Sequence, residues 1–340
     1  MKLRILSLIL IVFLMISGCT ASSGGKNEVS VPDAGAVFHF IDVGQGDCTL
    51  IQTSDTVILI DAGTAEAGSR VYNYLKDNGI KQIDCFILTH PHEDHMGGAA
   101  TVLSGIDVGT IFVSADTSDS YFYERFLDVV LDKNINMEFP DMDCVYDYGS
   151  VRVKFLSPKT DYGDLNQNCL VTMIEVGNTK ALFMGDAERI VEKTITEECN
   201  IKADILKVGH HGSRNGTSYA FLNEVLPAVS VIQCGKDNSY GHPHKEALDR
   251  LQKTNSQILR CDKDGDIILK TDGNKIYDEN DIEIKSAASA IDFSYIGNKK
   301  SKVFHTEECP NLPGSKNSII FKDRSEAVNK GYKPCGNCNP

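Results

Sequence analysis

Residues 89–95 read THPHEDH, and the apolar run 85–88 in front of them has the composition of a buried strand. Alternate strand residues share a face, so His90 and His92 project together, while Asp94 and His95 begin a turn toward a helix expected to start at the glycines 97–98. Imidazoles with a carboxylate suit zinc, and also manganese or iron. The spacing therefore indicates a metal site, the alternative being a solvated histidine-rich loop.

This stretch resembles the T-H-x-H-x-D-H signature of the metallo-β-lactamase-fold hydrolases. Further segments resemble the ComEC-like branch of that family over residues 36–270, in the same order: Ile41–Asp47, Leu59–Gly63, Phe183–Ala187, Leu206–Ser213 and Tyr240–Pro243. The resemblance implies an α/β fold, the four-layer αβ/βα sandwich, in a hydrolase domain at 36–275. It also implies two divalent metal ions, zinc or manganese, at one edge of the sheets.

The order of apolar runs agrees with sheets covered by helices. Strands are expected at 37–43, 48–52, 57–60, 85–88 and 203–208, and helices at 70–76, 121–131 and 219–226. Periodicity alone does not give the architecture.

The resemblance assigns metal binding to residues from three segments: His90, His92, Asp94, His95, Asp186 and His210. Asp186 is expected to bridge the two ions; from the sequence alone it can also be the N-cap of a helix beginning at Ala187. Of two neighbouring histidines, His210 is preferred as the ligand, and His211 with Ser213 is expected to face the substrate.

Catalysis is assigned to Asp94, His211 and His242. His242, in a Gly-His-Pro turn, is expected to contact phosphate or donate a proton; the alternative is a purely structural hydrogen bond. Asp61 ends a strand and is expected to fix the tautomer of a liganding imidazole. Asp42 and Asp47 flank two glycines that allow tight turns beside the metals, although both carboxylates can equally be solvated.

One departure from the family pattern concerns a missing histidine. Many members have a further histidine before the bridging aspartate, whereas none occurs here between His95 and His210. Residues 166–169 occupy that stretch, with Asn168 as the expected replacement. One ion is therefore expected to be held more weakly.

The amino terminus has the pattern of an exported lipoprotein. Residues 1–18 combine Lys2 and Arg4 with an apolar run too short to span a bilayer, as in a signal peptide. Cys19 follows a lipobox-like sequence and is the expected acylation site, with an ordinary cleaved signal as the alternative. Residues 19–35 are small and polar, like a flexible tether. The protein is therefore expected on the extracellular face of a bacterial membrane, held by lipid.

The charge and the cysteine content argue against two further properties, general coating of nucleic acid and a disulfide framework. The net charge of −13 argues against a protein that coats nucleic acid by overall attraction. The last 50 residues carry eight lysines and arginines against five acidic residues, whereas the rest carries 26 against 42. Seven of the eleven cysteines lie between residues 36 and 275, an odd number mostly in apolar runs, so we expect no disulfide framework.

The carboxyl-terminal segment indicates a second metal site. After a linker at 276–292, residues 293–340 contain one histidine and three cysteines with the spacing of a closed tetrahedral zinc site: His305, Cys309, Cys335 and Cys338. This segment resembles the Ada-type zinc-binding module, with a histidine replacing the first cysteine. A structural zinc would stabilise so small a core. Its positive charge is compatible with nucleic-acid contact, and a cap or wall-binding appendage is an equal alternative.

The predicted reaction is phosphodiester hydrolysis. Two ions about 3.5 to 4 Å apart would ionise a shared water that attacks phosphorus. The resemblance suggests DNA as substrate, whereas the residues alone suggest only hydrolysis, which also suits lactams, thioesters and lactones. Two alternatives remain: hydrolysis of wall polymers such as phosphocholine-bearing teichoic acid, and a non-catalytic DNA- or wall-binding module with metal in the tail alone. The sequence leaves the oligomeric state open.

Overall fold

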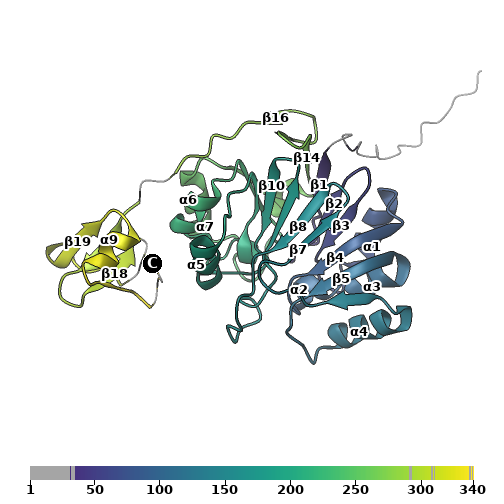
Figure 1. Cartoon of the computed structure of the whole chain (residues 1–340), viewed down its shortest axis with the longest axis horizontal. Coiled ribbons are helices and arrows are strands. Elements are labelled where there is room, and N and C mark those ends of the chain that lie inside the picture. The colour runs from purple at the N-terminus through teal and green to yellow at the C-terminus, as the bar shows by residue number, and fades with distance from the viewer. Residues whose placement is uncertain are drawn as a thin grey trace, which may run out of the picture.

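The computed structural model describes residues 31, 35–290, 293–307, 309, 311–336, 338 and 340. The expected signal peptide, the acylation site Cys19 and all of the tether except residues 31 and 35 lie outside this set. Within the described residues, no helix is both long enough and apolar enough to cross a bilayer. Figure 1 shows a large body of sheets and helices and a small carboxyl-terminal module.

Two sheets form the body (Figure 1). The first has nine strands in the spatial order β16-β15-β14-β1-β2-β3-β4-β5-β6. Its strands are β1 (Ala36–Phe40), β2 (Thr49–Gln52), β3 (Val57–Ile60), β4 (Gln82–Leu88), β5 (Asp107–Val113), β6 (Asn136–Glu138), β14 (Ile267–Thr271), β15 (Ile276–Tyr277) and β16 (Glu283–Ile284). The second has seven, in the order β13-β12-β11-β10-β9-β8-β7. These are β7 (Val145–Tyr148), β8 (Val151–Phe155), β9 (Thr172–Val176), β10 (Thr179–Phe183), β11 (Ile205–Lys207), β12 (Val229–Ile232) and β13 (Gln257–Arg260).

Helices cover the outer face of each sheet, so the body has four layers. Those on the first sheet are α1 (Gly68–Asp77), α3 (Ala99–Gly105) and α4 (Tyr121–Lys133). Those on the second are α5 (Arg189–Glu198), α6 (Tyr219–Val225) and α7 (Lys245–Lys253). Short helices α2 (Glu93–Met96) and α8 (Cys261–Asp264) and the 3-10 turn η1 (Gly209–Gly212) complete the body. The expected αβ/βα sandwich is confirmed.

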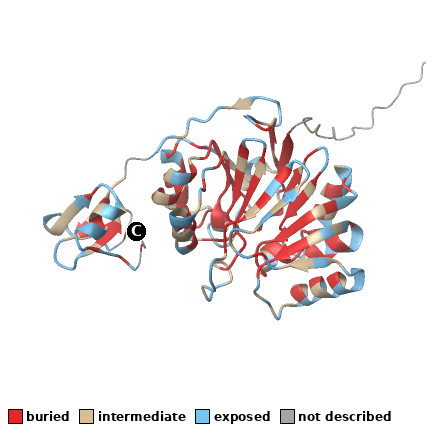
Figure 2. Cartoon of the chain, in the orientation of Figure 1, coloured by how far each residue is buried: buried red, intermediate tan, exposed pale blue. Residues whose placement is uncertain are grey.

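The central strands are buried on both faces, as Figure 2 shows for the middle of the body, whereas edge strands such as β6 and β7 are partly exposed. In β3, Ile58 and Ile60 join the cluster between the sheets, whereas Leu59 between them joins the cluster under the helices. In the sequence, a strand that is apolar on both faces appears as a continuous run of apolar residues and not as alternating apolar and polar residues. This is why periodicity could not assign the architecture.

Several boundaries differ from expectation. The first strand ends at Phe40 because the backbone N–H of Asp42 donates to Asp266 Oδ1 at 2.9 Å, leaving residues 41–47 as a loop. The helix expected to start at residues 97–98 is α3, which begins at Ala99 with Gly98 as its N-cap, whereas the short helix α2 in front of it, from Glu93, was not expected. The linker is also shorter than expected at its start, because β15 and β16 extend the first sheet to Ile284.

The carboxyl-terminal module has its own small sheet and core. The strands β17 (Tyr295–Asn298), β18 (Val303–Thr306), β19 (Ser318–Phe321) and β20 (Lys333–Pro334) pair in the order β19-β17-β18-β20. The 3-10 turn η2 (Ser315–Asn317) and helix α9 (Arg324–Asn329) join them. Five buried residues form the core, among them Phe304 and Phe321. So small a core agrees with the need for further stabilisation by metal.

Candidate metal centre

Metal-competent side chains from four distant segments meet at one edge of the two sheets. His90 and His95 follow β4 and are fully buried, and Asp186 follows β10 and is 2% exposed. His211 lies in η1 after β11, and Asp47 in the loop before β2. Adjacent strand ends therefore deliver these groups to a common point, as the sequence led us to expect.

The potential ligand atoms form two groups that share Asp186. One group contains Asp47, His95, Asp186 and His211, and the other His90, His92 and Asp186, with the ligand atoms of each group all within 4.8 Å of one another. Asp186 Oδ1 lies 3.2 Å from His95 Nε2, and its Oδ2 lies 3.8 Å from His90 Nε2. Asp186 is thus placed to bridge two ions, and the N-cap alternative is wrong because Glu188 is the N-cap of α5.

Unpaired polar atoms in this cluster test whether metal ions fit. Asp47 Oδ1, His95 Nε2 and Asp186 Oδ1 are buried without a hydrogen-bond partner, which is costly unless another ligand satisfies them. The Nδ1 atoms of His95 and His211 lie 2.8 Å from Asp61 Oδ2 and 3.0 Å from the Gln233 carbonyl oxygen. If these Nδ1 atoms carry the protons, both Nε2 lone pairs face the cluster, as in metal-binding histidines. The donor set fits divalent cations.

The electrostatics of the cluster agree with this interpretation. Burial lowers the pKa of His95 and His211, but neighbouring carboxylates, above all Asp186, outweigh it: the pKa of His95 lies well above its usual range and that of His211 rises to about 10. Burial lowers the pKa of His90 well below its usual range. The buried carboxylates thus need nearby positive charge, which divalent cations would supply in place of imidazole protons.

Lys207, which was not among the predicted site residues, also reaches the cluster: its ammonium group lies 2.5 Å from Asp47 Oδ2. Both side chains are buried, and Lys207 Nζ also donates to the carbonyl oxygen of Val208 at 2.9 Å. Asp47 is therefore part of the cluster, which removes the solvated-loop alternative for this residue. A lysine inside the apolar run 205–208 was the available signal, because an unpaired buried ammonium is very costly.

Asp61 and Asp42, the two other predicted carboxylates, have different surroundings. Asp61 is 1% exposed, with its Oδ2 2.8 Å from His95 Nδ1, and accepts from the backbone N–H of Thr89 at 2.8 Å. Asp42 instead accepts from the N–H of Gly44 within its own loop at 3.0 Å and belongs to neither ligand group. For Asp42 the loop alternative holds.

The preference for His210 over His211 is contradicted. Both residues have left-handed backbone angles, with φ of 46° and 52°, and their rings lie at 70° to each other. His211 Nε2 lies 3.5 Å from Asp186 Oδ1 and 3.2 Å from Asp94 Oδ2. His210 Nε2 also approaches Asp186, at 3.6 Å from Oδ2, but its ring is partly exposed, its Nδ1 lies 2.8 Å from Glu188 Oε1, and it belongs to neither ligand group. Ser213 also donates to Glu188 instead of facing the substrate side.

The assignment of Asn168 is also wrong. Its Oδ1 accepts from the N–H of Tyr162 at 2.7 Å, and its Nδ2 donates to Asp161 at 2.9 Å, so it braces its own loop. Asn166, two residues earlier, lines the cavity at the cluster and has a buried Oδ1 without a hydrogen-bond partner. The residue of this stretch that lines the cavity is therefore Asn166 and not Asn168.

A cavity of about 370 Å³ opens over the cluster. Its lining is mostly polar: Gln45, His92, Glu93, Asp94, Asn166, Asp186, His210, His211, Tyr240 and His242. His242 has a buried Nδ1 without a hydrogen-bond partner, and burial together with the adjacent His211 and His210 lowers its pKa to about 4. A neutral His242 at the cavity wall can accept or relay a proton there.

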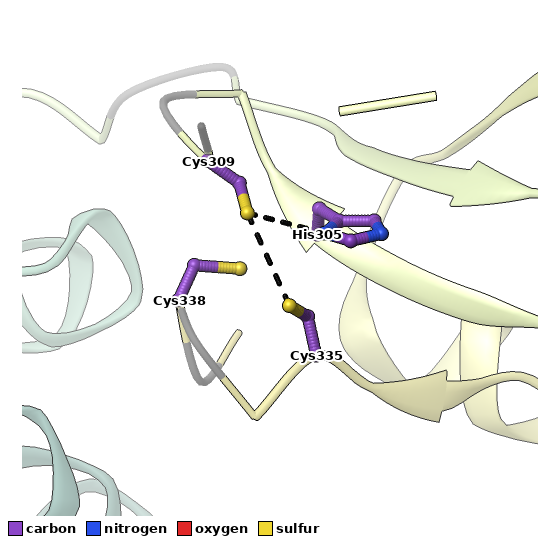
Figure 3. Close-up of side chains that lie close together, drawn as sticks. All are labelled: His305, Cys309, Cys335 and Cys338. Atoms are coloured by element: carbon purple, nitrogen blue, oxygen red, sulfur yellow. Dashed lines mark hydrogen bonds between the residues drawn. The ribbon is translucent and has the colours of Figure 1, made fainter. Parts of the chain in front are cut away.

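The four predicted tail ligands also converge (Figure 3). His305 Nδ1 lies 3.2 Å from Cys309 Sγ, and Cys309 Sγ lies 4.0 Å from Cys335 Sγ. Cys338 completes the buried set, whose ligand atoms all lie within 4.8 Å of one another. Three sulfurs and one nitrogen match a closed tetrahedral site.

Residues 41–236 match the metallo-beta-lactamase superfamily, and this match covers more than half of the sequence. The chain belongs to that superfamily. Residues 283–340 match the metal-binding domain of Ada. The protein is thus a ComEC-like member of the metallo-beta-lactamase superfamily with an Ada-type module.

Relatives and solved structures agree with this assignment. ComE operon protein 3 of Bacillus subtilis is 30% identical over 247 residues, covering 67% of this chain and 32% of the relative. Recombination protein 2 of Haemophilus influenzae is 29% identical, covering 64% of this chain and 26% of the relative. This metallo-beta-lactamase-fold chain therefore spans a third or less of the length of these relatives. Among solved structures, the metallo-beta-lactamase fold protein YhfI from Bacillus subtilis has 15% sequence identity and a TM-score of 0.51 with this chain. The match covers 69% of this chain and 99% of YhfI, and it supports the fold.

Proposed function

We propose that this protein is a metal-dependent phosphodiesterase, a nuclease that hydrolyses DNA on the extracellular face of a bacterial membrane. The observation that carries the proposal is the sharing of Asp186 by two ligand groups, with unpaired buried atoms directed into them. Hydrolase chemistry is supported by the superfamily. We propose three further points: a phosphodiester substrate, a lipid anchor at Cys19, and a location on the extracellular face of the membrane.

Two ions bound here would activate a water and neutralise the charge of a phosphodiester. Asp47, His95 and His211 would hold one ion and His90 and His92 the other, with Asp186 available to both groups. Asp61 and the Gln233 carbonyl orient two of the imidazoles. His242 at the cavity wall is placed to exchange a proton with the substrate.

DNA is favoured as the substrate by the relatives. They include the proteins named competence protein ComA, from Neisseria gonorrhoeae, and Recombination protein 2. This chain matches only part of the length of these relatives, so a function in DNA processing is proposed for it and not transferred from them.

We assign a structural zinc to the tail group, because it has no open coordination position.

The test combines metal analysis with hydrolysis. We expect three metal ions per chain in the wild type, two in the body and one in the tail, and cleavage of labelled DNA with manganese or zinc. Asp186→Asn should lose metal from the body and more than about 100-fold in rate, beyond the usual effect of residues that only orient ligands. Asp42→Asn, which changes a carboxylate outside the cluster, is the matched control and should retain both.

Three outcomes would contradict this function. Hydrolysis of a polyglycerol phosphate polymer without cleavage of DNA would favour a wall substrate. Turnover of neither would remove phosphodiesters altogether. A single ion per chain, held by the tail, together with no effect of His92→Ala on ligand binding, would support the non-catalytic surface module.

A further inference from the structure

An exposed aromatic ring stands at the cavity over the metal cluster. Tyr240 is 65% exposed and belongs to the cavity lining together with His242 and Asp186. Large aromatic side chains are usually at least partly covered in folded proteins, so one held open beside a cluster of ligands suggests contact with a substrate.

The orientation of this ring suits stacking. The rings of Tyr240 and His242 are nearly parallel, at 19°, with their centroids 5.8 Å apart. His242 therefore adjoins one face of the tyrosine ring. Because the side chain of Tyr240 is highly exposed, the other face of its ring has room for a second flat group.

The backbone that carries Tyr240 is fixed by a single side chain. Asn238 Oδ1 accepts from the N–H of Tyr240 at 3.2 Å and from that of His242 at 3.0 Å, while its Nδ2 donates to the Gly235 carbonyl at 2.8 Å. The backbone N–H of Gly235 in turn donates to Oε1 of Gln45, another residue of the cavity lining, at 3.1 Å. The loop thus holds the ring at a defined place relative to the cluster, which lowers the entropy cost of a contact.

We propose that Tyr240 is a stacking platform for an unpaired nucleobase next to the scissile phosphate. This inference rests on the proposed function and narrows it, since polyol phosphate polymers offer no flat ring. Every base has a π-face, so the contact is indifferent to sequence. Bases inside a duplex are already stacked on one another, so the platform favours single strands or frayed ends.

The test removes the ring from the protein and the base from the substrate. Metal-loaded full-length protein is given a single-stranded oligonucleotide and the same oligonucleotide with abasic sites around the scissile phosphate. The wild type should cleave the natural strand roughly 5- to 100-fold more efficiently, mainly through KM, as expected for loss of one stacked base. Tyr240→Ala should lose this preference by slowing cleavage of the natural strand alone, whereas Tyr240→Phe should keep it.

Tyr121→Ala is the matched control, because Tyr121 is 74% exposed and lies on α4 outside the cavity lining. It should behave as the wild type. Equal base preference in Tyr240→Ala and the wild type would overturn the stacking role while leaving the nuclease intact. No cleavage of any oligonucleotide by the metal-loaded wild type would overturn the proposed function and this inference together.

Discussion

Asp61 acts on the metal cluster through a neighbouring ring. Its Oδ2 lies 2.8 Å from His95 Nδ1, and its backbone φ of 57° is a conformation that asparagine also adopts readily. Asp61→Asn should therefore fold while losing the charge that orients the imidazole. We expect metal affinity in the body to fall about 10- to 100-fold, measured by competition with a chromophoric chelator. An affinity equal to that of Asp42→Asn would show that Asp61 has no orienting role.

Lys207 is one of the cations that balance Asp47 in the absence of metal, beside the imidazoles of His211 and His95. Removing one partner of a buried ion pair typically costs about 3 to 5 kcal/mol, so Lys207→Met should lower the free energy of unfolding by this order in the presence of a chelator. Divalent metal should reduce the deficit, because it supplies positive charge at the same carboxylates. Urea unfolding with and without metal measures both values.

Lys154→Met provides the comparison for Lys207. Lys154 pairs with Asp143 at the surface, at 3.2 Å, and such pairs contribute roughly 1 kcal/mol or less. Two results would contradict the proposed balance of charge. One is a similar loss of unfolding free energy in the two variants, and the other is a loss in Lys207→Met that is the same with and without metal.

At the scale of elements, the loop at 213–218 is held between two helices. Arg250 on α7 donates to the carbonyl oxygens of Thr217 at 2.8 Å and Gly216 at 2.8 Å, and Glu192 on α5 accepts from the N–H of Ser218 at 2.9 Å. Both charged side chains are buried. The loop follows directly on η1, so the two helices fix the chain immediately after His211.

Arg250→Met should leave these carbonyl oxygens buried and unpaired. We expect a loss of roughly 3 kcal/mol in unfolding free energy and faster amide hydrogen exchange in residues 213–218. The exposed Arg125 on α4 provides a control, since Arg125→Met should stay within about 0.5 kcal/mol of the wild type. Unchanged exchange in the loop would show that α7 does not hold it.

At the scale of the molecule, the module contacts the body at α5 and α6. The guanidinium of Arg189 donates to the Cys338 carbonyl oxygen at 2.8 Å, Arg324 lies 3.5 Å from Glu197, and the rings of Tyr219 and Phe293 stack at 5.6 Å. The first contact involves the backbone of a predicted tail ligand. We therefore expect docking of the module to depend on the order of the chain around Cys338.

Cys335→Ser should remove one metal ion per chain and unfold the module, because the small core depends on the ion. The body has its own cores and should retain its unfolding transition. Limited proteolysis should then cut the module away, as fragment masses would reveal. Cys144→Ser, a half-buried cysteine outside the tail group, should remain resistant, and equal resistance in Cys335→Ser would refute a structural ion.

The sequence by itself determined which chemical groups take part. The THPHEDH stretch, Asp186, Asp61 and the cysteines of the tail carry donor atoms at spacings that few other structures require, and the order of motifs specified the sandwich. These inferences succeed because ligand chemistry and strand ends are local properties of a short segment.

Only the tertiary structure decided which of two neighbours faces the cluster. His211 is buried in a ligand group, whereas His210 is partly exposed and belongs to neither group, although its Nε2 also lies 3.6 Å from Asp186 Oδ2. Asn166 reaches the cavity while Asn168 braces its own loop, and Lys207 meets Asp47 from a strand 160 positions away. The direction of a side chain in a turn and the partner of a buried charge depend on backbone angles and on packing between distant segments, which a linear pattern does not encode.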